Sequence, residues 1–261
     1  TQASQPYALA ADVAVKEFDV GPLFRAIDHS RPATVEGRFD VTSKVVARAA
    51  KFAGLAPGLT GDFQLTSRGG VFRGLPVNVS HLVENTSKLS GWIASAGTAI
   101  SSIAGKKDHA DIGNKVQAVA ELAKGLNPIP YDQLSVVMSR DAAFNTTLKD
   151  FTLISPELRL TGGGTALHRE GASVLTDSLA MEFKLRARGR QGDLLKYLGV
   201  LEPQPDDFGY AACTLPLKVG GTLANVDTNE LNARLVAIAL EKSGVTDKAA
   251  DLVNKIFGGG K

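Results

Sequence analysis

The sequence lacks the features that mark several large classes of protein. Cys213 is its single cysteine, so the chain forms no intramolecular disulfide and offers no cysteine cluster for a metal. Aromatic residues make up only 6% of the chain, and no run of about 18 apolar residues predicts a membrane-spanning helix. The formal net charge of +2 argues against a protein built mainly to bind nucleic acid. What remains is a globular chain of 261 residues, 44% of them hydrophobic, that can bury a substantial core.

The motifs of common enzymes and cofactor-binding proteins are missing as well. The glycine run at 162–164 lacks the Lys-Ser/Thr of a P-loop and the spacing of a dinucleotide fingerprint. No Gly-x-Ser-x-Gly elbow is present, and His29, His81, His109 and His168 fit no metal-binding pattern. We therefore expect no catalytic residue, no cofactor and no metal site, and predict that the protein is not an enzyme. A nucleophile hydrogen-bonded to one of the histidines would favour the alternative, a hydrolase without a familiar signature.

One local excess of positive charge stands out in an otherwise balanced chain. Lys184, Arg186, Arg188 and Arg190 occupy every second position, so they fall on one side of a strand and just beyond it. Two interpretations stay open: a solvated outer face, or a surface for an anionic partner such as a phospholipid head group. We expect Cys213 to be a small buried hydrophobic residue.

The clearest structural signal is alternation between apolar and polar residues. Between Leu179 and Arg188 the odd-numbered residues are apolar, whereas four of the five even-numbered ones are charged, which predicts a strand with one apolar face. Similar segments joined by short turns are typical of an antiparallel meander. The segments predicted to form strands are 7–20, 34–43, 59–66, 71–75, 131–140, 144–154, 157–167, 174–188 and 215–223.

Helical periodicity replaces the alternation in the middle and at the end of the chain. Apolar residues repeat every three or four positions over 78–104 and 108–123, which predicts an antiparallel helical hairpin. Other helices are expected at 23–29, 45–53, 191–201, 228–244 and 246–257, and residues 202–207, which include Pro203 and Pro205, are expected to form a loop.

Bends within the strands suggest that the sheet is curved. We expect a bulge near Glu17, and the glycines at 162–164 predict a further bulge or bend. The predicted fold is therefore α+β: a curved, mainly antiparallel sheet, shaped as a half-barrel or trough, with a helical hairpin inserted and C-terminal helices packed on it. We expect a single domain over 1–261, made of a first β section (1–77), the helical hairpin (78–127), and a β-meander with C-terminal helices (128–261).

The apolar side chains of the later strands form a candidate binding surface. Such a surface must be covered, either by the protein's own helices or by a bound apolar molecule. An acyl chain would gain about 0.8 kcal/mol for each methylene removed from water. The candidate groove residues are Leu158, Leu160, Leu179, Met181, Phe183, Leu185, Leu215, Leu217 and Val219.

Three stretches, taken in order, resemble the AsmA-like family of bacterial envelope proteins. Residues 61–65 and 70–75 resemble its glycine-phenylalanine strand, turn and hydrophobic strand. Residues 147–156 and 158–164 resemble a strand pair that ends in a glycine cluster. Residues 215–223, Leu-Pro-Leu-Lys-Val-Gly-Gly-Thr-Leu, are similar to the family's C-terminal strand.

The resemblance implies a function in the cell envelope. It implies a periplasmic protein of outer-membrane homeostasis that carries phospholipid, or another acyl-chain lipid, along an apolar β-groove, with envelope proteins as possible partners and no nucleic acid. The chain departs from the family pattern at Asn225-Val226, where a proline is expected, and in having no N-terminal membrane anchor. We therefore expect a fragment of a longer protein, tethered to the inner membrane through a segment absent from this chain. The alternative is a structural scaffold of the envelope with a fully packed core and no lipid.

Overall fold

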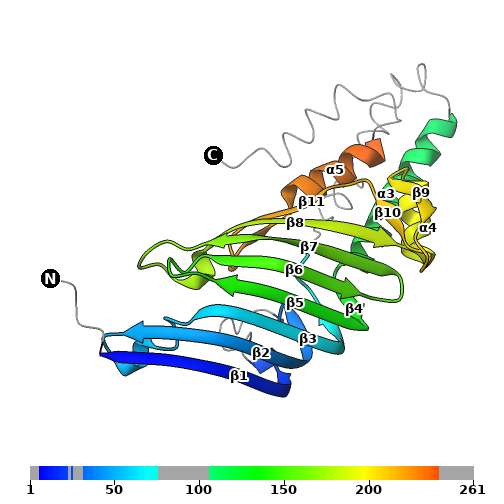
Figure 1. Ribbon diagram of the computed structural model, residues 1–261. Helices are drawn as coiled ribbons and strands as arrows, with labels where there is room; N and C mark the ends of the chain where they lie inside the picture. Colours follow the sequence, from blue (N-terminus) through cyan, green and yellow to red (C-terminus); the bar gives the residue numbers. More distant parts are fainter. Residues whose placement is uncertain (1–5, 23–24, 26–31, 76–105, 241–261) are drawn as a thin grey trace. The chain divides into compact units, whose positions relative to one another are not determined.

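The computed structural model describes residues 6–22, 25, 32–75 and 106–240. This part of the chain contains a 12-stranded antiparallel sheet, which does not close into a barrel, and three α-helices (Figure 1). The α+β class with a large antiparallel sheet, predicted from the sequence, is confirmed. No helix in the described part is both long and apolar enough to cross a membrane.

The strands follow a meander with short additions. The strands are β1 (Tyr7–Asp19), β2 (Val35–Ala49), β3 (Thr60–Phe72), β4 (Ile129–Tyr131), β5 (Gln133–Arg140), β6 (Thr146–Ile154), β7 (Leu158–Leu167), β8 (Ser178–Ala187), β9 (Leu201–Pro205), β10 (Ala211–Cys213), β11 (Leu217–Gly221) and β12 (Val226–Asp227). The helices are α3 (Lys106–Leu126), α4 (Gly189–Tyr197) and α5 (Asn229–Leu240), with 3₁₀ turns η1 (Phe52–Gly54) and η2 (Val174–Thr176). Hydrogen-bonded neighbours follow the order β1-β2-β3-β5-β6-β7-β8, and β4 pairs with β3.

The chain divides into two compact units. The first unit comprises Thr1–Gly74, Pro128–Leu185 and Leu217–Asp227, and it holds the meander together with β11 and β12. The second comprises Leu75–Asn127, Arg186–Pro216 and Thr228–Lys261, and it holds the three helices with β9 and β10. The single domain expected over 1–261 stays a prediction.

The core of the first unit is a row of side chains that crosses neighbouring strands. Pairing aligns residues of β2, β3, β5, β6 and β7 in one row on one side of the sheet. Each of these side chains is at most 3% exposed, so the row excludes water. The row consists of Phe39, Ser67, Leu134, Leu153 and Leu160.

Tyr131 closes one end of this core by lying across two glycines. Gly70 pairs with Gly37 on one side and with Tyr131 on the other, and a Cβ on either glycine would overlap the Tyr131 hydroxyl. The hydroxyl donates a hydrogen bond to the carbonyl of Glu36 (3.1 Å) and shares one with the Oγ of Ser67 (3.1 Å). Burial raises the pKa of Tyr131, and the hydrogen bond with Ser67 lowers it to a smaller extent.

In the second unit, α3 contacts both α4 and α5. Gly125 of α3 lets the helices approach closely, because a Cβ there would overlap the side chain of Gln191 in α4. Buried residues of α3 lie on one stripe of the helix, spaced mainly by three and four positions: Lys115, Ala118, Val119, Leu122, Ala123 and Leu126. Gly199 ends α4 with a φ of 74°, a left-handed conformation that glycine adopts without strain.

Several local predictions can be compared with this fold. The bulge near Glu17 is confirmed, because the β1–β2 register shifts between Val15 and Phe18 and Glu17 has a φ of 54°. The helix predicted over 45–53 is wrong: β2 continues to Ala49, because its residues pair with β1 as far as Ala49 and with β3 as far as Val46. The loop predicted around Pro203 and Pro205 is also wrong.

Those two prolines belong to β9, which ends the path of the sheet where a missing N–H is tolerated. The strand predicted over 174–188 begins with the turn η2 and becomes regular only in β8, from Ser178. The helices predicted over 23–29, 78–104 and 246–257 lie outside the described residues. Only the second arm of the expected helical hairpin is therefore described, as α3.

The raised pKa of Tyr131 predicts a loss of stability in alkali. The protonated hydroxyl stabilises the fold below the ordinary tyrosine pKa of about 10, and this contribution is lost as the pH rises above it. We expect Tyr131→Phe to lower the free energy of unfolding at neutral pH by about 1 kcal/mol, but to lose less stability than the wild type between neutral and strongly alkaline pH. Urea unfolding followed by circular dichroism measures both effects.

Tyr7→Phe is the control, because Tyr7 is exposed on β1. It should keep the wild-type difference between the two pH values. An alkaline loss in Tyr131→Phe as large as that of the wild type would contradict the prediction.

Candidate functional site on the apolar face of the sheet

One face of the first unit's sheet carries apolar side chains in continuous rows. Besides the buried row, a second row contains Val15, Val41, Leu65, Val136 and Phe151, paired from β1 to β6. A third row contains Val13, Ser43, Phe63, Met138 and Leu148. We call the surface formed by these three rows, together with Met181 and Phe183 of β8 and their β11 partners Val219 and Leu217, the apolar face.

The nine groove residues predicted from the sequence lie mostly in the core. Leu158 and Leu160 are in β7, and the strands β8 and β11 hold all the others except Leu215, which precedes β11 and belongs to the second unit. The buried members are Leu158, Leu160, Phe183, Leu185, Leu217 and Val219. The partly exposed members are Leu179, Met181 and Leu215.

Phe183 and Met181 lie over the glycines of β7. A Cβ on Gly162 would come within 2.6 Å of Cδ1 of Phe183, and a Cβ on Gly164 within 2.8 Å of the sulfur of Met181. The Phe183 ring also packs edge-on against Phe151, with centroids 5.3 Å apart. The glycine run therefore makes room for large side chains.

The bend expected at the glycine run takes a different form. Strand β7 is continuous through it, and the extra residue at the register shift lies on β6, between Leu148 and Phe151. The sequence identified the right pair of strands for the irregularity but placed the bulge on the wrong one.

The apolar face is open toward β1. Val13 and Val15 are 37% and 40% exposed, and Leu9 and Phe18 of the same strand are also exposed. Next to them, side chains of β2, β3 and β5 are partly exposed; they are Val41, Phe63, Leu65, Val136 and Met138. These residues are not among the groove candidates predicted from the sequence. Their alternation was visible, but their position near the edge of the sheet was not.

The opposite face of the same strands is charged. Asp12, Lys44 and Asp62 are paired across β1, β2 and β3, and Lys149 forms an ion pair of 2.7 Å with Asp62. A polar hollow of about 910 Å³ is lined by charges of both signs, from Glu17, Arg38, Asp40, Arg68 and Asp132, and by neutral residues. Its polar lining makes it unsuitable for an acyl chain, so the apolar face is the better candidate.

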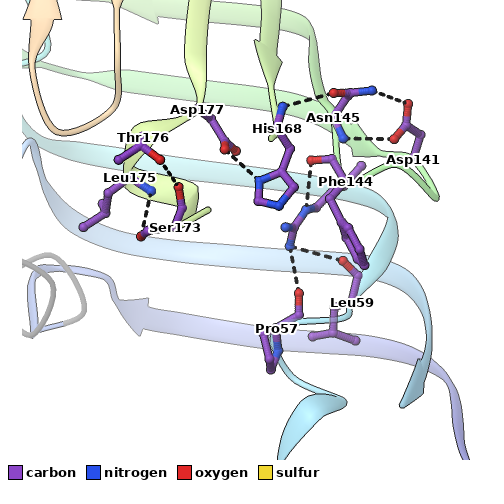
Figure 2. Close-up of polar contacts among 11 residues, drawn as sticks. Pro57, Leu59, Asp141, Phe144, Asn145, His168, Ser173, Leu175, Thr176 and Asp177 are labelled. Atoms are coloured by element: carbon purple, nitrogen blue, oxygen red, sulfur yellow. Dashed lines mark hydrogen bonds and ion pairs between the residues drawn. The ribbon is translucent and has the colours of Figure 1, made fainter. Parts of the chain in front are cut away.

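A polar network lies at the end of β5 (Figure 2). The Arg140 guanidinium donates from Nε to the carbonyl of Phe144 (3.3 Å) and from Nη1 to the carbonyls of Pro57 (3.2 Å) and Leu59 (3.5 Å). It also lies 4.8 Å from the centroid of the Phe144 ring. Arg140 thus connects the β5–β6 turn to the segment that precedes β3.

His168 and Asp177 form the second half of this network. The Nδ1 of His168 lies 2.8 Å from Oδ1 of Asp177, and the Asp177 side chain is almost fully buried. The backbone N–H of His168 donates a hydrogen bond to Oδ1 of Asn145 (3.0 Å). In the part of the chain that the structure describes, no serine, threonine or cysteine bonds to the His168 ring. The hydrolase alternative therefore finds no nucleophile there. His29 and His81, and the side chain of His109, lie outside the described residues.

No group of three or more His, Cys, Asp or Glu side chains within the described ranges could hold a metal ion. The three arginines of the basic run contact their own unit: Arg186 with Asp206 (3.4 Å), Arg188 with the Tyr210 ring (4.3 Å to its centroid) and Arg190 with Glu121 (2.7 Å). These contacts favour the interpretation of the run as an outer face over that of a free anionic-partner surface. Cys213 is only partly exposed, and burial raises the pKa of its thiol.

Filling the space over β7 should destabilise the protein. We expect Gly162→Ala to lower the free energy of unfolding by about 1–3 kcal/mol, because the new methyl group would overlap Phe183 and the backbone of β8. The matched control is Gly220→Ala in β11, where the nearest atom would be 3.8 Å from the new Cβ. Urea unfolding of both variants measures the difference. Equal losses of unfolding free energy would contradict the close packing of Phe183 over Gly162.

Comparison with known proteins adds no relative. No family model, curated protein or solved structure matches the chain. The resemblance to the AsmA-like family therefore rests on the sequence stretches described above and stays a hypothesis.

Proposed function

We propose that the apolar face binds the acyl chains of a phospholipid or a similar lipid, and that the protein is a non-enzymatic envelope protein that shields or carries lipid. One observation carries the proposal. Partly exposed apolar side chains stand in register across β1, β2, β3 and β5, while charged side chains occupy the other face of the same strands.

The dimensions of the apolar face suit an acyl chain. Neighbouring strands are about 4.8 Å apart, so a row that crosses the five strands β1, β2, β3, β5 and β6 spans about 19 Å. One leaflet of a bilayer has a hydrocarbon thickness of about 15 Å. Each methylene that leaves water for such a surface contributes about 0.8 kcal/mol, without precise polar contacts. A row of valine, leucine and methionine side chains is therefore sufficient to hold a chain.

The cellular setting in this proposal comes from the sequence resemblance. On that resemblance, the location in this proposal is the periplasm, with tethering to the inner membrane and a role in outer-membrane homeostasis. The lipid is then the main partner, and other envelope proteins are further partners. The apolar face supports the lipid part of this proposal on physical grounds.

A second candidate function is a structural or interaction scaffold of the cell envelope without lipid. Burial in β7, β8 and β11 favours the scaffold, because six of the nine groove candidates are already covered by the protein. The two candidates differ at the other end. A scaffold has no use for the exposed apolar side chains of β1, whereas a lipid-binding face does.

Placing charge on the open part of the apolar face should weaken lipid binding. Val13 and Val15 are partly exposed, so we expect the double variant Val13→Asp, Val15→Asp to fold. Because each valine contributes about 1.5 kcal/mol when fully buried, the affinity should fall roughly tenfold or more. Mass spectrometry of lipid bound to the purified protein, and titration with a fluorescent acyl lipid, measure the effect.

The matched control is Ala8→Asp, Ala14→Asp, which adds the same charges to the opposite face of the same strand. It should bind lipid as the wild type does. Wild-type protein that is purified without lipid and binds none on titration would favour the scaffold.

A further inference from the structure

Arg140 brings a positive charge to the border of the apolar face. It is the last residue of β5 and follows Leu134, Val136 and Met138 at every second position, so its side chain leaves the sheet on their side. Its paired neighbours are Gly61 and Thr146, and the next row along the strands holds Phe63, Met138 and Leu148. Arg140 therefore lies in the row directly next to partly exposed apolar side chains.

The charge of Arg140 has no acidic partner among the described residues. Three of its five N–H groups reach the carbonyls of Phe144, Pro57 and Leu59, which are neutral acceptors. Within the described ranges, no acceptor contacts the two N–H groups on Nη2. The positive charge and two N–H donors of Arg140 therefore remain available to an anionic ligand.

The nearby carboxylates bond to groups other than Arg140. Asp141 accepts hydrogen bonds from the N–H groups of Ala143 and Asn145, and its other oxygen accepts from the side chain of Asn145. Asp177 bonds to His168. Both carboxylates of the network therefore bond to groups in the turns next to them.

The network holds the guanidinium in a fixed orientation. Phe144 has a φ of 64°, a left-handed conformation that costs a bulky residue free energy. The conformation is held because the Phe144 N–H donates to the carbonyl of Asp141 and its own carbonyl accepts from Arg140. The ring also packs against the Arg140 guanidinium and in a T-shaped contact against His168, with centroids 5.8 Å apart. Backbone strain of this kind clusters at ligand-binding and other functional sites.

We propose that Arg140 binds the phosphate of an amphiphile whose acyl chain lies on the apolar face, so that the preferred ligand is an anionic phospholipid. This inference rests on the proposed function and adds the head group to it. A guanidinium forms short, charge-assisted hydrogen bonds to phosphate oxygens, and its planar pair of donors matches their geometry. Because the rest of its contacts are neutral, the phosphate supplies the missing negative charge.

Two soluble amphiphiles with the same chain test the inference. Dodecyl phosphate and dodecyl maltoside, both below their micelle concentrations, are titrated into the wild-type protein in a calorimeter. We expect the wild type to bind the phosphate about tenfold more tightly than the maltoside. Arg140→Gln should remove this preference and leave maltoside binding unchanged, while Arg140→Lys should keep part of it.

The matched control is Arg48→Gln, because Arg48 is an exposed arginine that pairs with Ala8 on the other face of the sheet. It should keep the wild-type preference. Inorganic phosphate alone should not displace dodecyl phosphate at equal concentration, since the chain supplies most of the binding.

The outcomes separate the two proposals. If the wild type binds both amphiphiles equally, or if a folded Arg140→Gln variant keeps the preference, the role of Arg140 is overturned and the lipid face remains. Displacement by inorganic phosphate would indicate a free-phosphate site and would overturn the inference. If the wild type binds neither amphiphile, the proposed function itself fails. Should Arg140→Gln not fold, the wild-type preference and the Arg140→Lys variant decide.

Discussion

Large side chains lie over glycines at two places in the sheet, and these contacts fix which residues face each other. Tyr131 covers Gly37 and Gly70, while Phe183 and Met181 cover Gly162 and Gly164. Any other residue at these positions would overlap the covering side chain or a neighbouring backbone. A slip of one residue would place a side chain under each ring and would turn every apolar residue of the strand to the charged side. The separation of the two faces therefore depends on residues that have no side chain.

The separation of the faces has a consequence for what the protein can bind. On the charged face, ion pairs form between neighbouring strands, as Asp62 and Lys149 illustrate. The apolar face has no such internal partner at its β1 end, where Val13 and Val15 remain exposed. Arg140 stands at the end of β5 on the apolar side, and its guanidinium donates to carbonyl groups. The arrangement favours a ligand that is apolar along most of its length and anionic at one end.

Much of the strand pattern could be predicted from the sequence, because alternation is a local property. The strands β1 and β8 and the bulge at Glu17 were found in this way. Over 45–53 the local signal favoured a helix, but pairing with β1 as far as Ala49 and with β3 as far as Val46 overrides such a preference. Pro203 and Pro205 suggested a loop because proline is excluded from central strands. An edge strand tolerates proline, but the local sequence does not show that β9 lies at the end of the sheet path.

The candidate site was harder to predict than the strands. The most apolar segments were chosen as groove, and those are the segments that the protein covers itself, as Leu160 and Leu217 show. The exposed part belongs to strands whose place near the edge depends on the order of the whole sheet. Arg140 could be assigned to the apolar side from its spacing to Met138. Its carbonyl partners at Pro57 and Leu59 lie more than 80 positions away in the sequence, and no local pattern connects them.

The bulge at Glu17 also limits what the outer edge of β1 can do. Within the described residues, β1 pairs with β2 alone, and a long unpaired edge is a template for adding a foreign strand. Up to Val15 the backbone is regular; beyond it, the register shift and the left-handed Glu17 bend the edge away from a straight path. An incoming strand would therefore meet a kink after Val15, which restricts unwanted growth of the sheet to the first part of this edge.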